Sequence, residues 1–276
     1  MDLSRYRVPS ATLFCIFVTL AISVILPIVL LIVWRSKTKA KISSFFFGVG
    51  TFVVFSMILE SILHNVLLKV MGQQAFTALP FKAVYGGLAA GVFEEFGRYI
   101  VMILFMKKYI TKKEGIMFGI GHGGIESILI TGLSSISNLV ISMMLNAGQG
   151  SLLATGMNDE MKTKFVVQLS PLWNSSPTLF LWGGLERVSA ITFHICASYL
   201  VYRAVKDKKF VLCLLAVLLH AVMDGVMVVI QGTFDSYLVT ELFLFVFALI
   251  FAVFTVKEYL REKEKTVDLQ PAVNEE

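Results

Sequence analysis

The chain has 276 residues, of which 57% are hydrophobic and 16% are charged, and its mean hydropathy is +0.79. This composition excludes a soluble globular enzyme and predicts an all-α, polytopic membrane protein that contacts the lipid bilayer over most of its length. A multi-pass protein of a cell membrane, the bacterial plasma membrane, is expected.

Seven apolar segments, each near or above the roughly 20 residues that a helix needs to cross a bilayer, follow one another along the chain. They cover residues 12–34, 43–67, 83–106, 115–145, 180–202, 210–230 and 239–256. The fourth is long enough to be tilted, broken or extended beyond the lipid. Together they predict one transmembrane helical domain over residues 1–260, with the candidate site at about 83–232. Residues 261–276 are predicted to form a disordered cytoplasmic tail.

Basic residues alternate between the two ends of the predicted helices. The loops after the first, third and fifth segments and the tail after the seventh together hold 16 Lys and Arg, whereas the opposite ends hold six. Positively charged loops stay in the cytoplasm, so the amino terminus is predicted to lie outside and the carboxyl terminus in the cytoplasm. The net charge of +5 is therefore a topology signal, and no nucleic-acid partner is expected.

All four histidines lie inside apolar segments, and each has an acidic residue four or eight positions away on the same helical face. The pairs are Glu60 and His64, His122 and Glu126, Glu186 and His194, and His220 and Asp224. Glu94 and Arg98 form a further pair of opposite charge with the same spacing. Ionisable groups are costly in lipid, and such residues mark functional sites by default.

Depth in the membrane decides which of these residues can meet. Counted at about 1.5 Å per residue from the cytoplasmic end, six of them lie about 10 to 20 Å deep: Glu94, Glu95, His122, Glu126, His194 and His220. Glu60 and His64 come out at about 26 to 32 Å on the same scale. The six are therefore predicted to form one polar layer near mid-membrane. Glu60 and His64 are expected near the outer surface, outside that cluster.

Such a layer has the groups that hydrolysis inside the membrane needs. A carboxylate in a site of low dielectric constant can act as general base toward water, while histidines donate hydrogen bonds to a developing oxyanion or ligate a metal. The three histidines His122, His194 and His220 would suit Zn²⁺, which commonly takes three protein ligands and one water. Glu126 and Glu186 would then contact these ligand residues and orient them, without binding the metal themselves. These residue types are compatible with two mechanisms of hydrolysis, one that uses a glutamate alone and one that depends on a metal ion.

Three short motifs occur in order along the chain. They are Glu94-Glu95-Phe96-Gly97-Arg98, Phe118-Gly119-Ile120-Gly121-His122 and His220-Ala221-Val222-Met223-Asp224. These motifs resemble the EExxR/K, FxxxH and HxxxD/N motifs of the PrsW-type and CAAX-protease-like (Abi) intramembrane proteases. With residues 121–126 and 186–194 between them, the chain most resembles the YhfC family of glutamic-type or metal-dependent intramembrane proteases, over about residues 90–225.

The resemblance implies an intramembrane endopeptidase that cleaves a membrane-embedded or membrane-associated protein. A glutamate of the first motif would activate the attacking water, and His122 and His220 would hold that water or the oxyanion. Arg98 would orient a glutamate through an ion pair, and Asp224 would orient His220.

Two other classes of protein also carry ionisable residues in the membrane. A proton- or cation-coupled transporter is one, although transporters usually contain inverted repeats, and the sequence shows no convincing internal symmetry. A non-catalytic scaffold that has kept the same residues is the other. At single positions, structural interpretations compete: His64 as an interhelical hydrogen-bonding residue, and Arg98 as the ion-pair partner of one glutamate. The adjacent glutamate, about 100° around the helix, would then remain unexplained.

Overall fold

The computed structural model describes residues 3–234 and 236–262, and every regular element within these ranges is a helix. The elements are η1 (Leu3–Arg5), α1 (Ser10–Thr38), α2 (Ile42–Thr51), η2 (Phe52–Glu60), α3 (Ser61–Met71), η3 (Ala75–Thr77), α4 (Leu79–Val101), η4 (Met102–Met106), α5 (Lys112–Ser127), η5 (Ile128–Gly132), α6 (Leu133–Asn146), α7 (Gly150–Leu153), α8 (Asp159–Leu169), α9 (Pro171–Asn174), α10 (Leu179–Lys206), α11 (Phe210–Phe234) and α12 (Tyr237–Arg261). The predicted all-α class is confirmed. The expected tail at 261–276 lies, after Glu262, outside the described residues.

Six helices within the described ranges are long and apolar enough to cross a membrane. They are Ser10–Thr38, Ile42–Met71, Lys112–Asn146, Leu179–Lys206, Phe210–Phe234 and Tyr237–Arg261. The continuous helix of α4 and η4 corresponds to the predicted third segment, but it contains Glu94, Glu95 and Arg98 and is not among those six. A multi-pass membrane protein is thus confirmed. The number of seven crossings and the orientation stay predictions.

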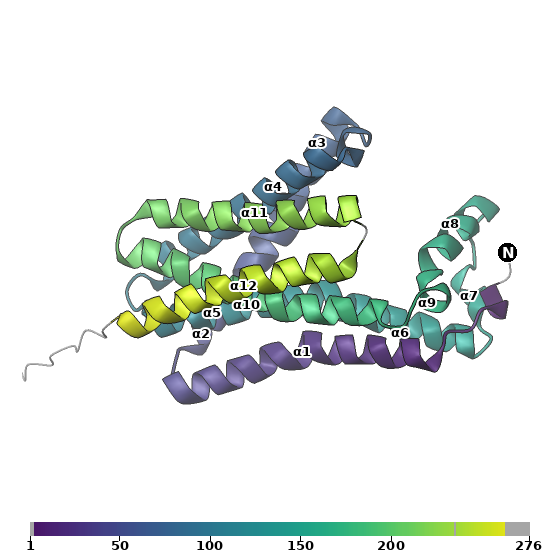
Figure 1. Cartoon of the computed structure of the whole chain (residues 1–276), viewed down its shortest axis with the longest axis horizontal. Helices are drawn as coiled ribbons and strands as arrows, with labels where there is room; N and C mark the ends of the chain where they lie inside the picture. Colours follow the sequence, from purple (N-terminus) through teal and green to yellow (C-terminus); the bar gives the residue numbers. More distant parts are fainter. Residues whose placement is uncertain (1–2, 235, 263–276) are drawn as a thin grey trace, which may run out of the picture.

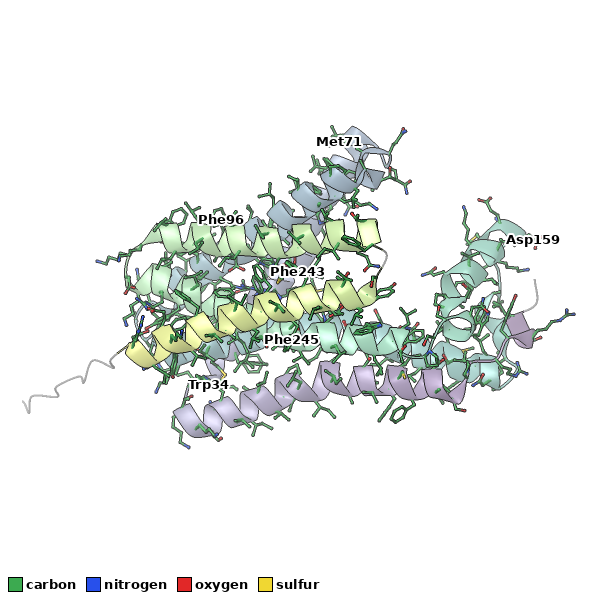
Figure 2. All side chains as sticks on the ribbon, in the orientation of Figure 1. Trp34, Met71, Phe96, Asp159, Phe243 and Phe245 are labelled. Atoms are coloured by element: carbon green, nitrogen blue, oxygen red, sulfur yellow. The ribbon has the colours of Figure 1, made fainter. Side chains whose placement is uncertain are left out.

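Figure 1 shows α1, α11 and α12 running along the long axis of the molecule, whereas α3 and α4 run obliquely and project beyond α11. At the end of the molecule that holds the N-terminus, α7, α8 and α9 lie beside η1 and the end of α6. Side chains cover the long helices on all sides (Figure 2), and large apolar residues such as Phe245 and Met71 are about half exposed. An apolar outer surface of this kind is expected where a protein faces lipid.

Glycines bring the helices that carry the polar faces into close contact. A Cβ atom at Gly91 of α4 would lie 2.7 Å from the carbonyl oxygen of Val217 on α11. One at Gly119 of α5 would lie 2.6 Å from the Cα atom of Ile195 on α10. No side chain fits at such distances, and small residues are the usual means of close helix approach in membranes. The polar faces of these four helices are thereby held around a common interior.

Candidate active site

Arg98 lies at the centre of a polar network built by α4, α5, α10 and α11, and its side chain is completely buried. Its Nη1 donates to Glu95 Oε1 at 2.5 Å. Its Nη2 donates to Glu94 Oε2 at 3.0 Å and to His194 Nδ1 at 2.7 Å. Positions three and four apart share a helical face, so α4 presents both glutamates to the arginine one turn later. The guanidinium group therefore joins two carboxylates of α4 to a histidine of α10.

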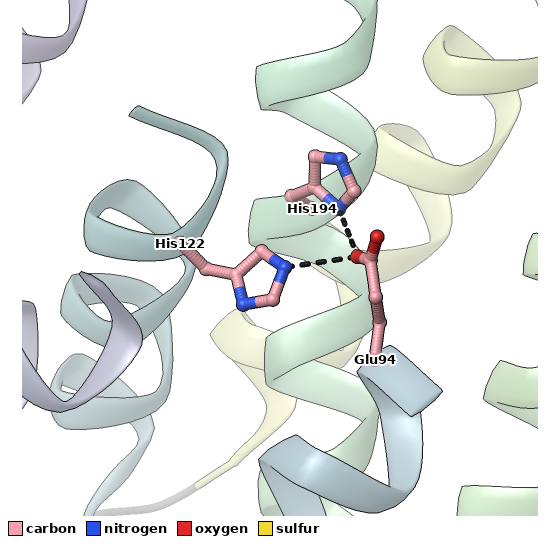
Figure 3. A group of neighbouring side chains, drawn as sticks. All are labelled: Glu94, His122 and His194. Carbon is pink, nitrogen blue, oxygen red and sulfur yellow. Dashed lines mark hydrogen bonds and ion pairs between the residues drawn. The ribbon is translucent and has the colours of Figure 1, made fainter. Parts of the chain in front are cut away.

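Glu94 forms the connection to α5. His122 Nε2 lies 2.9 Å from Glu94 Oε2, and His194 Nδ1 lies 3.7 Å from the same oxygen, as the dashed lines in Figure 3 show. One ligand atom from each of these three buried residues lies within 4.8 Å of the other two. The centroids of the two histidine rings are 5.2 Å apart. Glu94, His122 and His194 thus form a group of donor atoms that could converge on one metal ion.

Two predicted supporting residues lie behind His194. Its Nε2 contacts Glu126 Oε2, and Glu126 Oε1 accepts a hydrogen bond of 2.8 Å from Arg187 Nη1. Arg187 Nη2 in turn donates to Glu186. Because His194 Nδ1 accepts from Arg98, the proton of a neutral His194 ring resides on Nε2, facing Glu126. The carboxylate of Glu126 therefore fixes the tautomer and orientation of this ring.

His220 lies on the other side of the network. Its Nδ1 is 2.8 Å from Glu95 Oε1, and its Nε2 is 3.5 Å from Asp224 Oδ2. The sequence predicted His122, His194 and His220 as the metal ligands. In the structure, the ligand atoms of His122 and His194 group with Glu94 instead, and His220 contacts Glu95, the residue next to Glu94. The His220 side chain is 3% exposed, but that of Asp224 is 31% exposed. Asp224 therefore lies at one edge of the network, and Glu186, which is 29% exposed, lies at another.

Some buried atoms of the network have no hydrogen-bond partner among the described residues, and they include Glu95 Oε2, His122 Nδ1 and Arg98 Nε. A buried polar atom without a partner costs on the order of 1–3 kcal/mol. In native proteins such atoms call for an explanation such as water, an ion or a functional role. Glu95 is the most informative of these residues, because Arg98 and His220 hold one of its oxygens while the other has no hydrogen-bond partner among the described residues.

Glu60 is a neighbour of the network that the depth count placed elsewhere. It ends η2, is buried, and interacts electrostatically with Glu94, His220 and Asp224. The count assumed straight α-helices along the membrane normal, but η2 is a π-helix and α3 and α4 run obliquely (Figure 1). The position of Glu60, an acidic residue inside an apolar segment, was the feature of the sequence that indicated a place near the polar network. The side chain of His64, in contrast, contacts Glu60 and Tyr85.

Known proteins similar to this chain share the region that holds the network. The family model described as "YhfC intramembrane metalloprotease" matches residues 22–244. A curated relative, "Uncharacterized membrane protein YhfC" of Bacillus subtilis (strain 168), is 40% identical over 206 residues, which cover 74% of this chain and 79% of the relative. No solved structure matches the chain significantly. The matched residues include every member of the polar network, and the chain belongs to the YhfC family.

Proposed function

We propose that this protein is a metal-dependent intramembrane endopeptidase that hydrolyses a peptide bond in a membrane-embedded or membrane-associated protein. The observation that carries the proposal is the buried group of Glu94, His122 and His194, with Glu95 directly beside it. Amide hydrolysis needs an electrophile and a base, and a metal site with a separate carboxylate supplies both. The description of the family supports the same class of reaction.

The donor set suits Zn²⁺. Two imidazole nitrogens and one carboxylate oxygen are common ligands of catalytic zinc, which keeps a fourth position for water. The charges fit as well, because three buried carboxylates, Glu94, Glu95 and Glu126, face two buried guanidinium groups, Arg98 and Arg187. A cation offsets this excess of buried negative charge. When bound, such an ion would polarise the substrate carbonyl and acidify its own water.

Arg98 and a metal ion would compete for His194. A neutral imidazole ring has one acceptor nitrogen, and here that nitrogen, Nδ1, accepts from Arg98 Nη2. The same guanidinium nitrogen bonds to Glu94 Oε2. Ligation of a metal by Glu94 and His194 therefore requires Arg98 Nη2 to withdraw. Arg98 would hold these two ligand residues in place while the site is without metal.

Glu95 is the proposed general base. Arg98 and His220 fix its Oε1, and its buried Oε2 has no partner among the described residues, so this oxygen is available to take a proton from water. His220 acts as a positioning residue for Glu95, and Asp224 orients His220 in turn. Glu94 and Glu95 thus take separate roles although they are adjacent, because their side chains leave α4 in different directions.

The proposal is tested with the full-length protein purified in detergent. We expect about one zinc per chain, in line with a single group of three ligands. We also expect cleavage of labelled single-pass transmembrane peptides that a chelator abolishes and added zinc restores. Cleavage that is indifferent to the chelator would favour the glutamic mechanism. Proton flux into liposomes without cleavage of any peptide would favour a transporter and contradict the proposal.

A further inference from the structure

A pocket with both polar and apolar lining residues lies between α3 and α4, the oblique pair of helices that projects beyond α11 (Figure 1). Its volume is about 560 Å³, and its polar lining residues are His64, Asn65, Gln73, Thr77, Lys82 and Tyr85. Basic residues are concentrated at the opposite ends of these helices, so the predicted topology places this pocket at the outer face of the membrane. The proposed active site makes no use of this pocket.

His64 connects the pocket to the interior. Its side chain is 43% exposed, and its Nδ1 lies 2.5 Å from the hydroxyl oxygen of Tyr85 in the pocket wall. Its other ring nitrogen, Nε2, lies 3.3 Å from Glu60 Oε1, and the Glu60 side chain is 12% exposed. One ring nitrogen of His64 thus faces the pocket and the other faces a buried carboxylate, so the ring connects the two.

Glu60 connects His64 to the candidate active site. It is buried at the end of η2, which packs against α4 and α5, and its charge interacts with those of Glu94, His220 and Asp224. Phe52, at the beginning of the π-helix that ends with Glu60, packs its ring 5.4 Å from that of His122. The helix η2 therefore reaches from the site toward the pocket. π-helical segments occur frequently at functional sites.

Asp224 is the most exposed of the network residues on α4 and α11. A side chain that is 31% exposed at this position would meet either lipid or water. A carboxylate facing lipid is costly, and ionisable residues in membrane segments almost always face the bundle interior or a water-filled cavity. Exposure rises from Glu95 through His220 to Asp224. A partly exposed carboxylate within a membrane segment therefore favours a water-filled space beside Asp224.

We propose that Asp224, Glu60 and His64 line a route by which water from the pocket between α3 and α4 reaches the hydrolytic site. The inference rests on the proposed function, because hydrolysis consumes one water molecule per bond cleaved. It assigns Glu60 and His64 a role in hydration of the site, in place of a purely structural hydrogen bond between helices.

Accessibility of introduced thiols tests the route without any need for catalysis. The three native cysteines, Cys15, Cys196 and Cys213, are buried and free, and they are first replaced by alanine. Glu60→Cys is then compared with Ile58→Cys, which lies two residues away on the same helix and is 49% exposed on the surface. Both are treated with a membrane-impermeant cationic methanethiosulfonate, added to intact cells or to inside-out vesicles.

We expect Glu60→Cys to react from the outer face on the order of 100-fold faster than Ile58→Cys, because thiols react as thiolates and ionise only in contact with water. Equal slow rates at the two positions would overturn the route. Reaction of Glu60→Cys only from the cytoplasmic face would overturn it as well. An outer reaction in a protein that cleaves no peptide would leave the route standing and contradict the proposed function instead.

A second measurement applies if the cysteine variant does not fold. Glu60→Leu replaces the carboxylate by an apolar group of similar size, whereas Glu60→Gln keeps a polar side chain. We expect bound metal to be unchanged in both, and kcat for peptide cleavage to fall about tenfold or more in Glu60→Leu relative to Glu60→Gln, with KM unchanged. Equal kcat values in the two variants would contradict the route.

Discussion

Two acid and histidine pairs in this protein have the same spacing and similar geometry but different surroundings. His64 Nε2 lies 3.3 Å from Glu60, and His220 Nε2 lies 3.5 Å from Asp224. The other ring nitrogen differs: that of His64 meets a tyrosine hydroxyl at the pocket, whereas that of His220 meets Glu95 in the network. Spacing along one helix thus places two groups on one face. The neighbouring helices decide whether the pair becomes part of the buried polar network.

The largest expected effect distinguishes the four histidines by metal content. His122→Ala and His194→Ala each remove one of three proposed ligands, so bound zinc should fall to background. His220→Ala and His64→Ala should retain the metal, because these rings contact Glu95 and Glu60 instead. Metal analysis of the purified variants checks this, with thermal stability in detergent as the control for folding. Loss of zinc in His220→Ala would restore the three-histidine ligand set.

Two buried glutamates outside the ligand group, Glu95 and Glu60, give the next contrast. Glu95→Gln should lower kcat by about 10²- to 10⁴-fold, the usual contribution of a general base, while zinc stays bound. Glu60→Gln keeps a polar group on the proposed water route and should cost less than about tenfold. Single-turnover cleavage of a transmembrane peptide measures both. Similar losses in the two variants would mean that Glu95 is not the base.

Hydropathy predicted the helices well because lipid requires each crossing segment to be an apolar helix of about 20 residues. The first, predicted at 12–34, is Ser10–Thr38, and the last, predicted at 239–256, is Tyr237–Arg261. Depth also predicted that residues of four helices could share a layer, and they are in contact there. The partners within the layer could not be predicted, because the rotation and tilt of each helix depend on packing. The position from which His194 reaches Arg98, for example, depends on the close approach of α10 to α5, where a Cβ at Gly123 would lie 3.0 Å from the Cβ of His194.

The helices pack more tightly around His220 and Asp224 than around Glu60 and His64, and substitutions at two glycines of α4 test this difference. Gly91 lies beside His220, and a Cβ there would approach Val217 O to 2.7 Å. Gly91→Ala should therefore destabilise the protein by about 1–3 kcal/mol, the usual cost of overpacking. Gly86 lines the outer pocket, where a Cβ would meet no atom within 4 Å, so Gly86→Ala should be neutral. Thermal unfolding in detergent compares them, and equal losses would contradict this difference in helix approach.

A comparison of the two buried arginines, Arg98 and Arg187, gives the smallest expected effect, which is a change in metal affinity. Arg98 occupies the acceptor nitrogen of His194, whereas Arg187 bonds to Glu126 behind that ring. Arg98→Gln should strengthen zinc binding by about tenfold, because the loss of one competing charged hydrogen bond is worth about 1.4 kcal/mol or more. Arg187→Gln should weaken it by about tenfold, as the loss of support for a ligand does.

Both substitutions remove one positive charge near the same site. Long-range electrostatics alone would therefore strengthen metal binding in both variants, and a purely structural role of both arginines would weaken it in both. Only direct competition for His194 Nδ1 gives opposite signs. Competition against a chromophoric zinc chelator measures the two affinities without reference to cleavage, so the result holds whether or not a substrate has been found. Equal signs would show that Arg98 and the metal do not share this nitrogen.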